Sequence, residues 1–332
     1  MTLGSHQRPQ FSVEDLELLQ QVEGGPGPPA QHTLEMATAR LYKDLLHRPA
    51  NRAFLDDVLT GPGRISEAYI AGIVPGAFYR EHKNTGANGA RIAATLQKLG
   101  IPGEIIPVRS FGRLSENAAI IREWLKEQRR QGKREVILIT LSKGGADCKA
   151  ALRLGDSAEW NHVAAWLNLS GIVQGTPLIA WLRRQPLRLL GVRGWLWWHG
   201  QSFAAADDLR HGPSAPLGPW PEPPQHVRLI HVLAFPLRRH LRHPWAPRAY
   251  ERLAPLGPND GGGIPLDDAR HFPGVVCPVW GADHYLEPAW DVSPFLRNVI
   301  LAALSPVRRM NPAIETAWAA TPSAAPTTRS TK

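Results

Sequence analysis

Residues 136–150 read Val-Ile-Leu-Ile-Thr-Leu-Ser-Lys-Gly-Gly-Ala-Asp-Cys-Lys-Ala. The apolar run 136–139 has no polar interruption and predicts a buried strand. Ser142 follows almost at once, and after it come Gly144, Gly145 and a segment compatible with a helix. The order predicts a strand, a sharp turn and a helix. The two glycines fit this interpretation, because a strained turn needs small neighbours where the helix packs close behind it.

Strands and helices alternate in the pattern from about residue 68 onward. We predict strands at 69–74, 104–108, 136–140, 163–169, 227–235 and 275–280. We predict the intervening helices at 89–99, 115–129 and 144–154. Near-continuous apolar strands separated by helices indicate a parallel sheet that is covered on both faces. Ligands of such sheets bind at the carboxyl ends of the strands.

The rest of the chain divides around this pattern. Residues 1–65 form a predicted helical N-terminal leader without recognisable chemistry, and residues 66–305 form the α/β domain. Within that domain, residues 176–226 interrupt the alternation with five of the 12 tryptophans and a proline-rich exit. We interpret them as a cap or lid insertion. Residues 306–332 are rich in Ala, Pro, Ser and Thr, which predicts a disordered tail.

The chain carries a net charge of +9, and residues 151–331 contain arginine but no lysine. This bias is compatible with nucleic acid or another anionic surface as a partner. A GC-rich coding sequence explains it better, because alanine and proline are also frequent and no nucleic-acid-binding motif accompanies the arginines. We therefore expect no nucleic-acid partner.

Several other classes of protein are disfavoured. No apolar run reaches 18 residues, so we expect no transmembrane segment. The first ten residues lack the features of a secretory signal, which favours a cytoplasmic location. Cys148 and Cys277 are interpreted as buried thiols, and no metal-binding spacing is present. The glycines at 261–263 lack the Lys-Ser/Thr of a phosphate loop, so neither a metal nor a cofactor is expected.

Two later loops offer partners for Ser142. A serine hydroxyl needs a base within hydrogen-bond reach, and the base needs a group that fixes its tautomer. Residues 275–284 read Val-Val-Cys-Pro-Val-Trp-Gly-Ala-Asp-His, which places His284 just after the last predicted strand. Residues 257–263 read Gly-Pro-Asn-Asp-Gly-Gly-Gly and contain Asp260, 24 positions earlier. Asp267, Asp268 and Asp283 are alternative acids.

Two more segments complete the set of motifs. Residues 74–79 read Val-Pro-Gly-Ala-Phe-Tyr and follow the first predicted strand. Residues 169–178 read Leu-Ser-Gly-Ile-Val-Gln-Gly-Thr-Pro-Leu and follow the fourth. In this order, the motifs resemble those of lipase- and esterase-like serine hydrolases of the α/β-hydrolase superfamily. In this superfamily the strand-turn-helix segment that carries the serine is called the nucleophile elbow, and it usually has glycine two residues before the serine. This chain has Thr140 there, as some lipases also do.

The resemblance implies an α/β-hydrolase fold, with a mostly parallel, doubly wound sheet and a cap insertion; the helical leader has no counterpart in it. It implies Ser142 as nucleophile, His284 as general base and then acid, and Asp260 as the orienting carboxylate. It also implies that the backbone N–H groups of Ala77 and Lys143 form an oxyanion hole, with Phe78 as a second candidate donor.

The implied activity is hydrolysis of carboxylic esters through an acyl-enzyme, acting on a small-molecule or lipid-like ester. A tryptophan-rich cap suggests a hydrophobic acyl or aromatic group, although these tryptophans could equally pack in a core. Two other functions stay open at this point. One is a thioesterase or acyltransferase with the same triad, and the other is a catalytically inactive binding protein on this fold.

Overall fold

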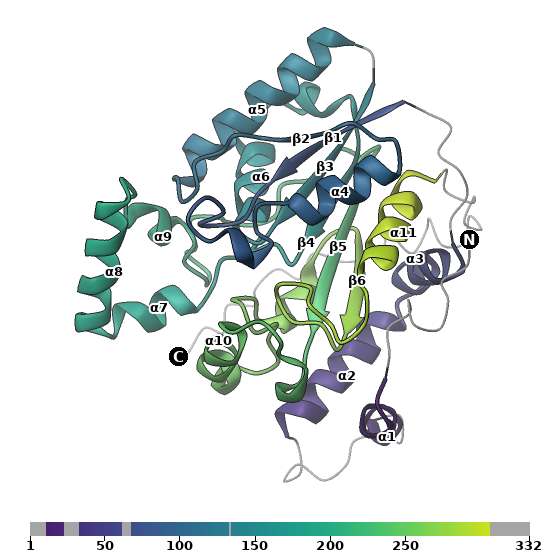
Figure 1. Ribbon diagram of the computed structural model, residues 1–332, viewed down its shortest axis with the longest axis vertical. Helices are drawn as coiled ribbons and strands as arrows, with labels where there is room; N and C mark the ends of the chain where they lie inside the picture. The colour runs from purple at the N-terminus through teal and green to yellow at the C-terminus, as the bar shows by residue number, and fades with distance from the viewer. Residues whose placement is uncertain (1–10, 23–32, 62–67, 133, 306–332) are drawn as a thin grey trace, which may run out of the picture.

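The computed structural model describes residues 11–22, 33–61, 68–132 and 134–305 (Figure 1). The predicted tail, 306–332, and parts of the predicted leader lie outside these ranges. Among the described helices, none combines the length and the apolar character that a bilayer span requires.

The centre of the molecule is a six-stranded sheet in which all neighbouring strands are parallel, in the order β2-β1-β3-β4-β5-β6. The strands are β1 (Tyr69–Val74), β2 (Gly103–Ile105), β3 (Glu135–Leu141), β4 (Val163–Leu169), β5 (Arg228–Phe235) and β6 (Val275–Trp280). The six predicted strands are therefore confirmed. Only β2 is clearly shorter than predicted, because Pro107 has no N–H to extend the ladder.

Helices cover both faces of the sheet (Figure 1). Successive residues of a strand point to opposite faces, so Ile137 and Ile139 of β3 join one core and Val136 and Leu138 join the other. The first core includes residues of α3 (Pro49–Thr60), α4 (Ala90–Lys98) and α11 (Ser293–Leu304). The second includes residues of α5 (Leu114–Gln131) and α6 (Lys143–Leu154). This is the doubly wound arrangement that the sequence predicts.

Two further N-terminal helices lie beside β6. They are α1 (Val13–Gln21) and α2 (Leu34–Leu46), and Leu19 and Tyr42 share a hydrophobic cluster with Trp280. A buried carboxylate also anchors α1, because Asp15 pairs with Arg239 at 2.6 Å. Hydrophobic and ionic contacts thus hold the described part of the leader against the sheet edge.

Three helices separate β4 from β5 and extend beside the sheet as an arm (Figure 1). They are α7 (Leu178–Arg183), α8 (Pro186–Trp198) and α9 (Ala204–Asp208). They fall within the predicted insertion at 176–226. One more helix, α10 (Ala246–Leu253), follows β5. The remaining helical turns are 3-10 helices: η4 (Lys83–Thr85), η5 (Ser157–Trp160), η6 (Arg238–His240), η7 (Ala254–Leu256) and η8 (Leu266–His271).

Candidate active site

Ser142 alone connects the end of β3 to the start of α6. Its backbone angles, φ 48° and ψ −118°, are unfavourable for a residue with a side chain. Three hydrogen bonds hold this conformation. The Ser142 N–H donates to the Leu169 carbonyl at 3.2 Å, and the Ser142 carbonyl accepts from the N–H groups of Gly145 at 3.0 Å and Ile172 at 2.9 Å. The strained turn thus fixes Ser142 at the carboxyl end of the sheet.

Close packing behind Ser142 explains the sequence around it. A side chain at Gly144 would overlap the carbonyl oxygen of Val74 and come within 2.8 Å of that of Pro75, so α6 begins directly against the end of β1. Thr140, which replaces the usual glycine, points toward β4. Its buried hydroxyl donates to Asn168 Oδ1 at 2.9 Å and accepts from Trp166 Nε1 at 3.0 Å. The threonine is therefore accommodated without disturbing the turn.

His284 and Asp260 lie next to Ser142. His284 Nε2 is 2.9 Å from Ser142 Oγ, and His284 Nδ1 is 2.5 Å from Asp260 Oδ2. The backbone adds a further link, because the His284 N–H donates to the Asp260 carbonyl at 2.8 Å. Both side chains are buried. Residues that are 142 and 24 positions apart in the chain thus form one continuous hydrogen-bonded series of side chains.

The glycine-rich loop holds the second oxygen of the Asp260 carboxylate. Asp260 Oδ1 accepts backbone N–H groups from Gly262 at 2.9 Å, Gly263 at 3.0 Å and Ile264 at 2.9 Å. A buried carboxylate needs such donors, because desolvation otherwise disfavours its charge. The loop therefore orients Asp260 and keeps one oxygen directed at His284.

The pair of buried groups is electrostatically matched. Burial raises the pKa of Asp260, but the facing His284 and the backbone N–H groups outweigh burial, and the net pKa lies below the usual value. Burial lowers the pKa of His284, but the Asp260 carboxylate outweighs it, and the net pKa lies above the usual value. The site thus stabilises a protonated imidazole next to a charged carboxylate.

The alternative acids have other partners. Asp268 Oδ2 is 3.0 Å from His211 Nε2, and Asp267 Oδ1 is 3.4 Å from the Nε of Arg270. The buried carboxylate of Asp283 accepts three backbone N–H groups from neighbouring loops. Of these four carboxylates, Asp260 is the one that is hydrogen-bonded to the His284 ring in the described part of the chain.

Two backbone N–H groups beside Ser142 are available to a ligand. Lys143 is the first residue of α6, so its N–H has no partner within the helix. Ala77 lies in the turn after β1, and a side chain at the preceding Gly76 would come within 3.3 Å of the Ser142 Cβ. Within the described residues, neither N–H donates a hydrogen bond. The N–H of Phe78, the second candidate, is engaged by the Ser110 carbonyl at 3.0 Å.

An aromatic cluster that the motifs did not predict joins this turn to α8. The rings of Phe78 and Trp195 are 5.2 Å apart, and His82 contacts both Trp195 at 5.8 Å and Trp245 at 4.8 Å. Tyr285 adds a ring 5.3 Å from His284. The tryptophan-rich composition of 176–226 was the only sequence signal for such a cluster. The contacts place apolar surface next to the turn that carries Ala77.

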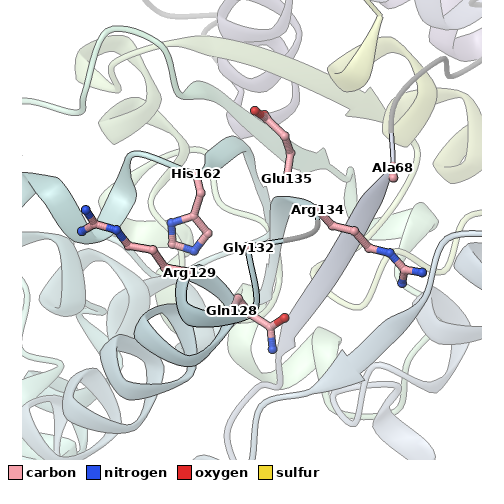
Figure 2. Close-up of a pocket in the computed structure, with 7 residues that line it drawn as sticks. All are labelled: Ala68, Gln128, Arg129, Gly132, Arg134, Glu135 and His162. Carbon is pink, nitrogen blue, oxygen red and sulfur yellow. The ribbon is translucent and has the colours of Figure 1, made fainter.

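A separate depression of about 420 Å³ lies at the other end of the sheet (Figure 2). Figure 2 shows its lining residues, Ala68, Gln128, Arg129, Gly132, Arg134, Glu135 and His162. They precede or begin β1, β3 and β4, whereas Ser142 follows the end of β3. This depression is therefore not part of the Ser142 site. Elsewhere in the described ranges, no group of three or more His, Cys, Asp or Glu side chains is arranged to hold a metal ion.

Comparisons with known proteins bear on the fold. No protein-family model matches the sequence, and no curated protein sequence matches it. A metagenomic carboxyl esterase has a similar structure, with a TM-score of 0.51 and 19% identity over 73% of this chain and 77% of that one. The mature form of a Bacillus licheniformis lipase gives a TM-score of 0.51 and 18% identity over 74% of this chain and 94% of that one. The parallel sheet, its two helical layers and these likenesses show that the chain has the α/β-hydrolase fold.

Proposed function

We propose that this protein is a serine hydrolase that cleaves carboxylic esters through an acyl-enzyme. The observation that carries the proposal is the hydrogen-bonded series of three side chains. Ser142 Oγ is 2.9 Å from His284 Nε2, and His284 Nδ1 is 2.5 Å from Asp260 Oδ2. A serine acts as a nucleophile when an oriented imidazole accepts its proton. The likeness in fold to an esterase and a lipase is compatible with this chemistry.

In the first half of the reaction, Ser142 Oγ attacks the ester carbonyl carbon while His284 Nε2 takes its proton. Asp260 holds the imidazole in the tautomer that bears hydrogen on Nδ1 and stabilises the imidazolium that forms. The N–H groups of Ala77 and Lys143 donate to the oxyanion. Each such donor contributes about 2.7–4 kcal/mol to transition-state stabilisation in comparable sites.

The tetrahedral intermediate then collapses. The bond between the carbonyl carbon and the alcohol oxygen breaks, and His284 returns its proton to the departing alcohol. In the second half, His284 takes a proton from a water molecule that attacks the acyl group on Ser142. Collapse of this second intermediate returns the proton to Ser142 Oγ and releases the carboxylic acid.

The surroundings of the site favour an apolar group on the substrate. The rings of Phe78, Trp195 and Trp245 gather on the side of the Ala77 turn. Aromatic side chains bind acyl chains or aromatic rings through area burial and ring stacking. We therefore propose a hydrophobic acyl or aryl ester as the substrate class.

Turnover of p-nitrophenyl esters of increasing acyl length tests the proposal. We expect hydrolysis by the wild type and a loss of at least about 10⁴-fold in kcat for Ser142→Ala. Ser170→Ala is the matched control, because Ser170 also follows a strand end with positive φ (44°) but has no imidazole partner within the described residues. Equal turnover by wild type and Ser142→Ala would contradict the proposal. Turnover of thioesters but not of oxyesters would keep the triad and change the substrate class.

A further inference from the structure

Helix α8 presents an apolar face to solvent. Four large apolar side chains of this helix are mostly exposed: Leu187 (86%), Leu190 (69%), Trp197 (77%) and Trp198 (79%). At about 100° per residue, these four positions and the two glycines of the helix fall within one arc of about 120°. Apart from the backbone of the helix itself, no atom of the described residues lies within 4 Å of where a side chain would begin at either glycine. We call this surface the α8 apolar face.

The opposite side of α8 is packed against the molecule. Leu196 is buried, and the partly buried Val192 and Trp195 pack against the same hydrophobic core as α5 and α6. The helix is therefore already held in place by one side. Contiguous apolar surface that stays exposed after such docking is typical of an interaction site.

Two arginines flank the α8 apolar face. In the same helical projection, Arg188 lies beyond one edge of the arc and Arg193 beyond the other. The Arg188 guanidinium is 5.3 Å from the centre of the Trp181 ring, and the Arg193 guanidinium is 5.1 Å from that of Phe203. In the described part of the chain, neither arginine has an acidic partner. Both positive charges remain available to an anionic ligand.

A groove of about 550 Å³ lies beside α10, and its lining includes Trp181, whose ring Arg188 contacts. The lining also includes Arg248 and Arg252, and the Arg252 guanidinium lies 4.0 Å from the centre of the same indole ring. Burial and the neighbouring guanidinium groups lower the pKa of Arg252. The one carboxylate of the lining, Glu251, is ion-paired with Arg238 at 2.7 Å. The groove therefore has more positive than negative charge.

The chemistry of this surface selects its partner. Residues 171–206 contain no Asp or Glu, so the apolar face has no acidic group at its borders within that segment. A second copy that paired face to face would bring arginines next to arginines, which is unfavourable. An anionic phospholipid surface offers acyl chains to the leucines and tryptophans, and phosphates to the arginines. We propose that the α8 apolar face binds an anionic phospholipid surface.

Vesicle co-sedimentation of the full chain tests the proposal. Vesicles of phosphatidylcholine, with and without phosphatidylglycerol, are compared at low and high salt. We expect stronger binding to the anionic vesicles, weakened by salt. Leu187→Gln with Leu190→Gln should reduce the partition coefficient at least about tenfold. Arg188→Gln with Arg193→Gln should reduce it about fivefold per arginine on the anionic vesicles only.

The matched control is Ile105→Gln with Leu154→Gln, which changes two exposed apolar residues outside the cap. We expect it to bind like the wild type. Circular dichroism and thermal unfolding check that every variant is folded, independently of any hydrolytic activity. Absence of anionic-vesicle binding by the wild type, or equal binding by the leucine variant, would overturn the proposal. Sedimentation velocity tests whether a second copy of the chain binds this face instead. If the wild type bound no lipid and formed a dimer, and the leucine variant were a monomer, the face would be assigned to a second copy.

Discussion

The backbone of Gly262 lies directly against the imidazole of His284. A methyl group on Gly262 would overlap the Cβ, Cγ and Cδ2 atoms of that side chain. The same glycine donates its N–H to Asp260 Oδ1 at 2.9 Å. One residue of the glycine-rich loop 257–263 therefore orients the carboxylate and also limits where the imidazole can lie.

Gly262→Ala should displace His284 and reduce kcat/KM by about 10²-fold, because a misplacement of about 1 Å costs that much in a preorganised site. Steady-state hydrolysis of a short soluble ester measures the effect. Gly191→Ala serves as the control, since there is open space around that glycine. If Gly262→Ala had the same kcat/KM as the wild type, the position of the His284 imidazole would not matter for the reaction, which would contradict the prediction.

The pH dependence of kcat/KM should report the titration of His284. In the proposed mechanism the neutral imidazole is the active base, and the Asp260 carboxylate raises the pKa of His284 above its ordinary value of 6.5. The rate should therefore rise with pH with a midpoint above 6.5. Asp260→Asn removes the charge that raises this pKa, so the midpoint should move to lower pH while the plateau falls by about 10⁴-fold. An upward shift in the variant would contradict this assignment.

A buried ion pair lies within the first turn of α6. Lys143 Nζ is 2.6 Å from Asp147 Oδ1, and both side chains are 1% exposed. Asn117 donates to the second oxygen of Asp147 at 2.9 Å. Asp147→Ala should lower the free energy of unfolding by about 3–5 kcal/mol, because it leaves the lysine charge buried without a partner.

Urea denaturation measures that loss. Lys143→Met combined with Asp147→Leu removes both charges and should be markedly more stable than Asp147→Ala alone, since well-packed apolar residues often replace a buried pair at little cost. Equal instability of the single and double variants would show that packing around these side chains, rather than the uncompensated charge, sets the cost.

The fold could be predicted from the sequence because its signals are local. Apolar runs such as 136–139 are long enough to identify buried strands, and their alternation with helices fixes a parallel sheet. The order of Ser142, Asp260 and His284 made them candidates before any geometry. Spacing did not separate Asp260 from Asp267 and Asp268, because the choice depends on which carboxylate reaches His284.

Other features depend on contacts that no motif encodes. The side-chain partners of Thr140 lie on β4 and the N–H partner of Phe78 follows β2, far away in the sequence. The tryptophans of the insertion suggested either a substrate-binding surface or core packing. Trp197 and Trp198 are not packed into a core within the described residues, because both are largely exposed. Their exposure follows from the packing of α8, which contacts the molecule through the side that carries Leu196.

Intact-mass analysis after treatment with a fluorophosphonate probe tests the central claim most directly, because the probe labels a serine only when its hydroxyl is activated. The wild type should gain the mass of one adduct, and folded Ser142→Ala should gain none. An unlabelled but folded wild type, or an adduct that persists in Ser142→Ala, would contradict the assignment of Ser142 as the nucleophile.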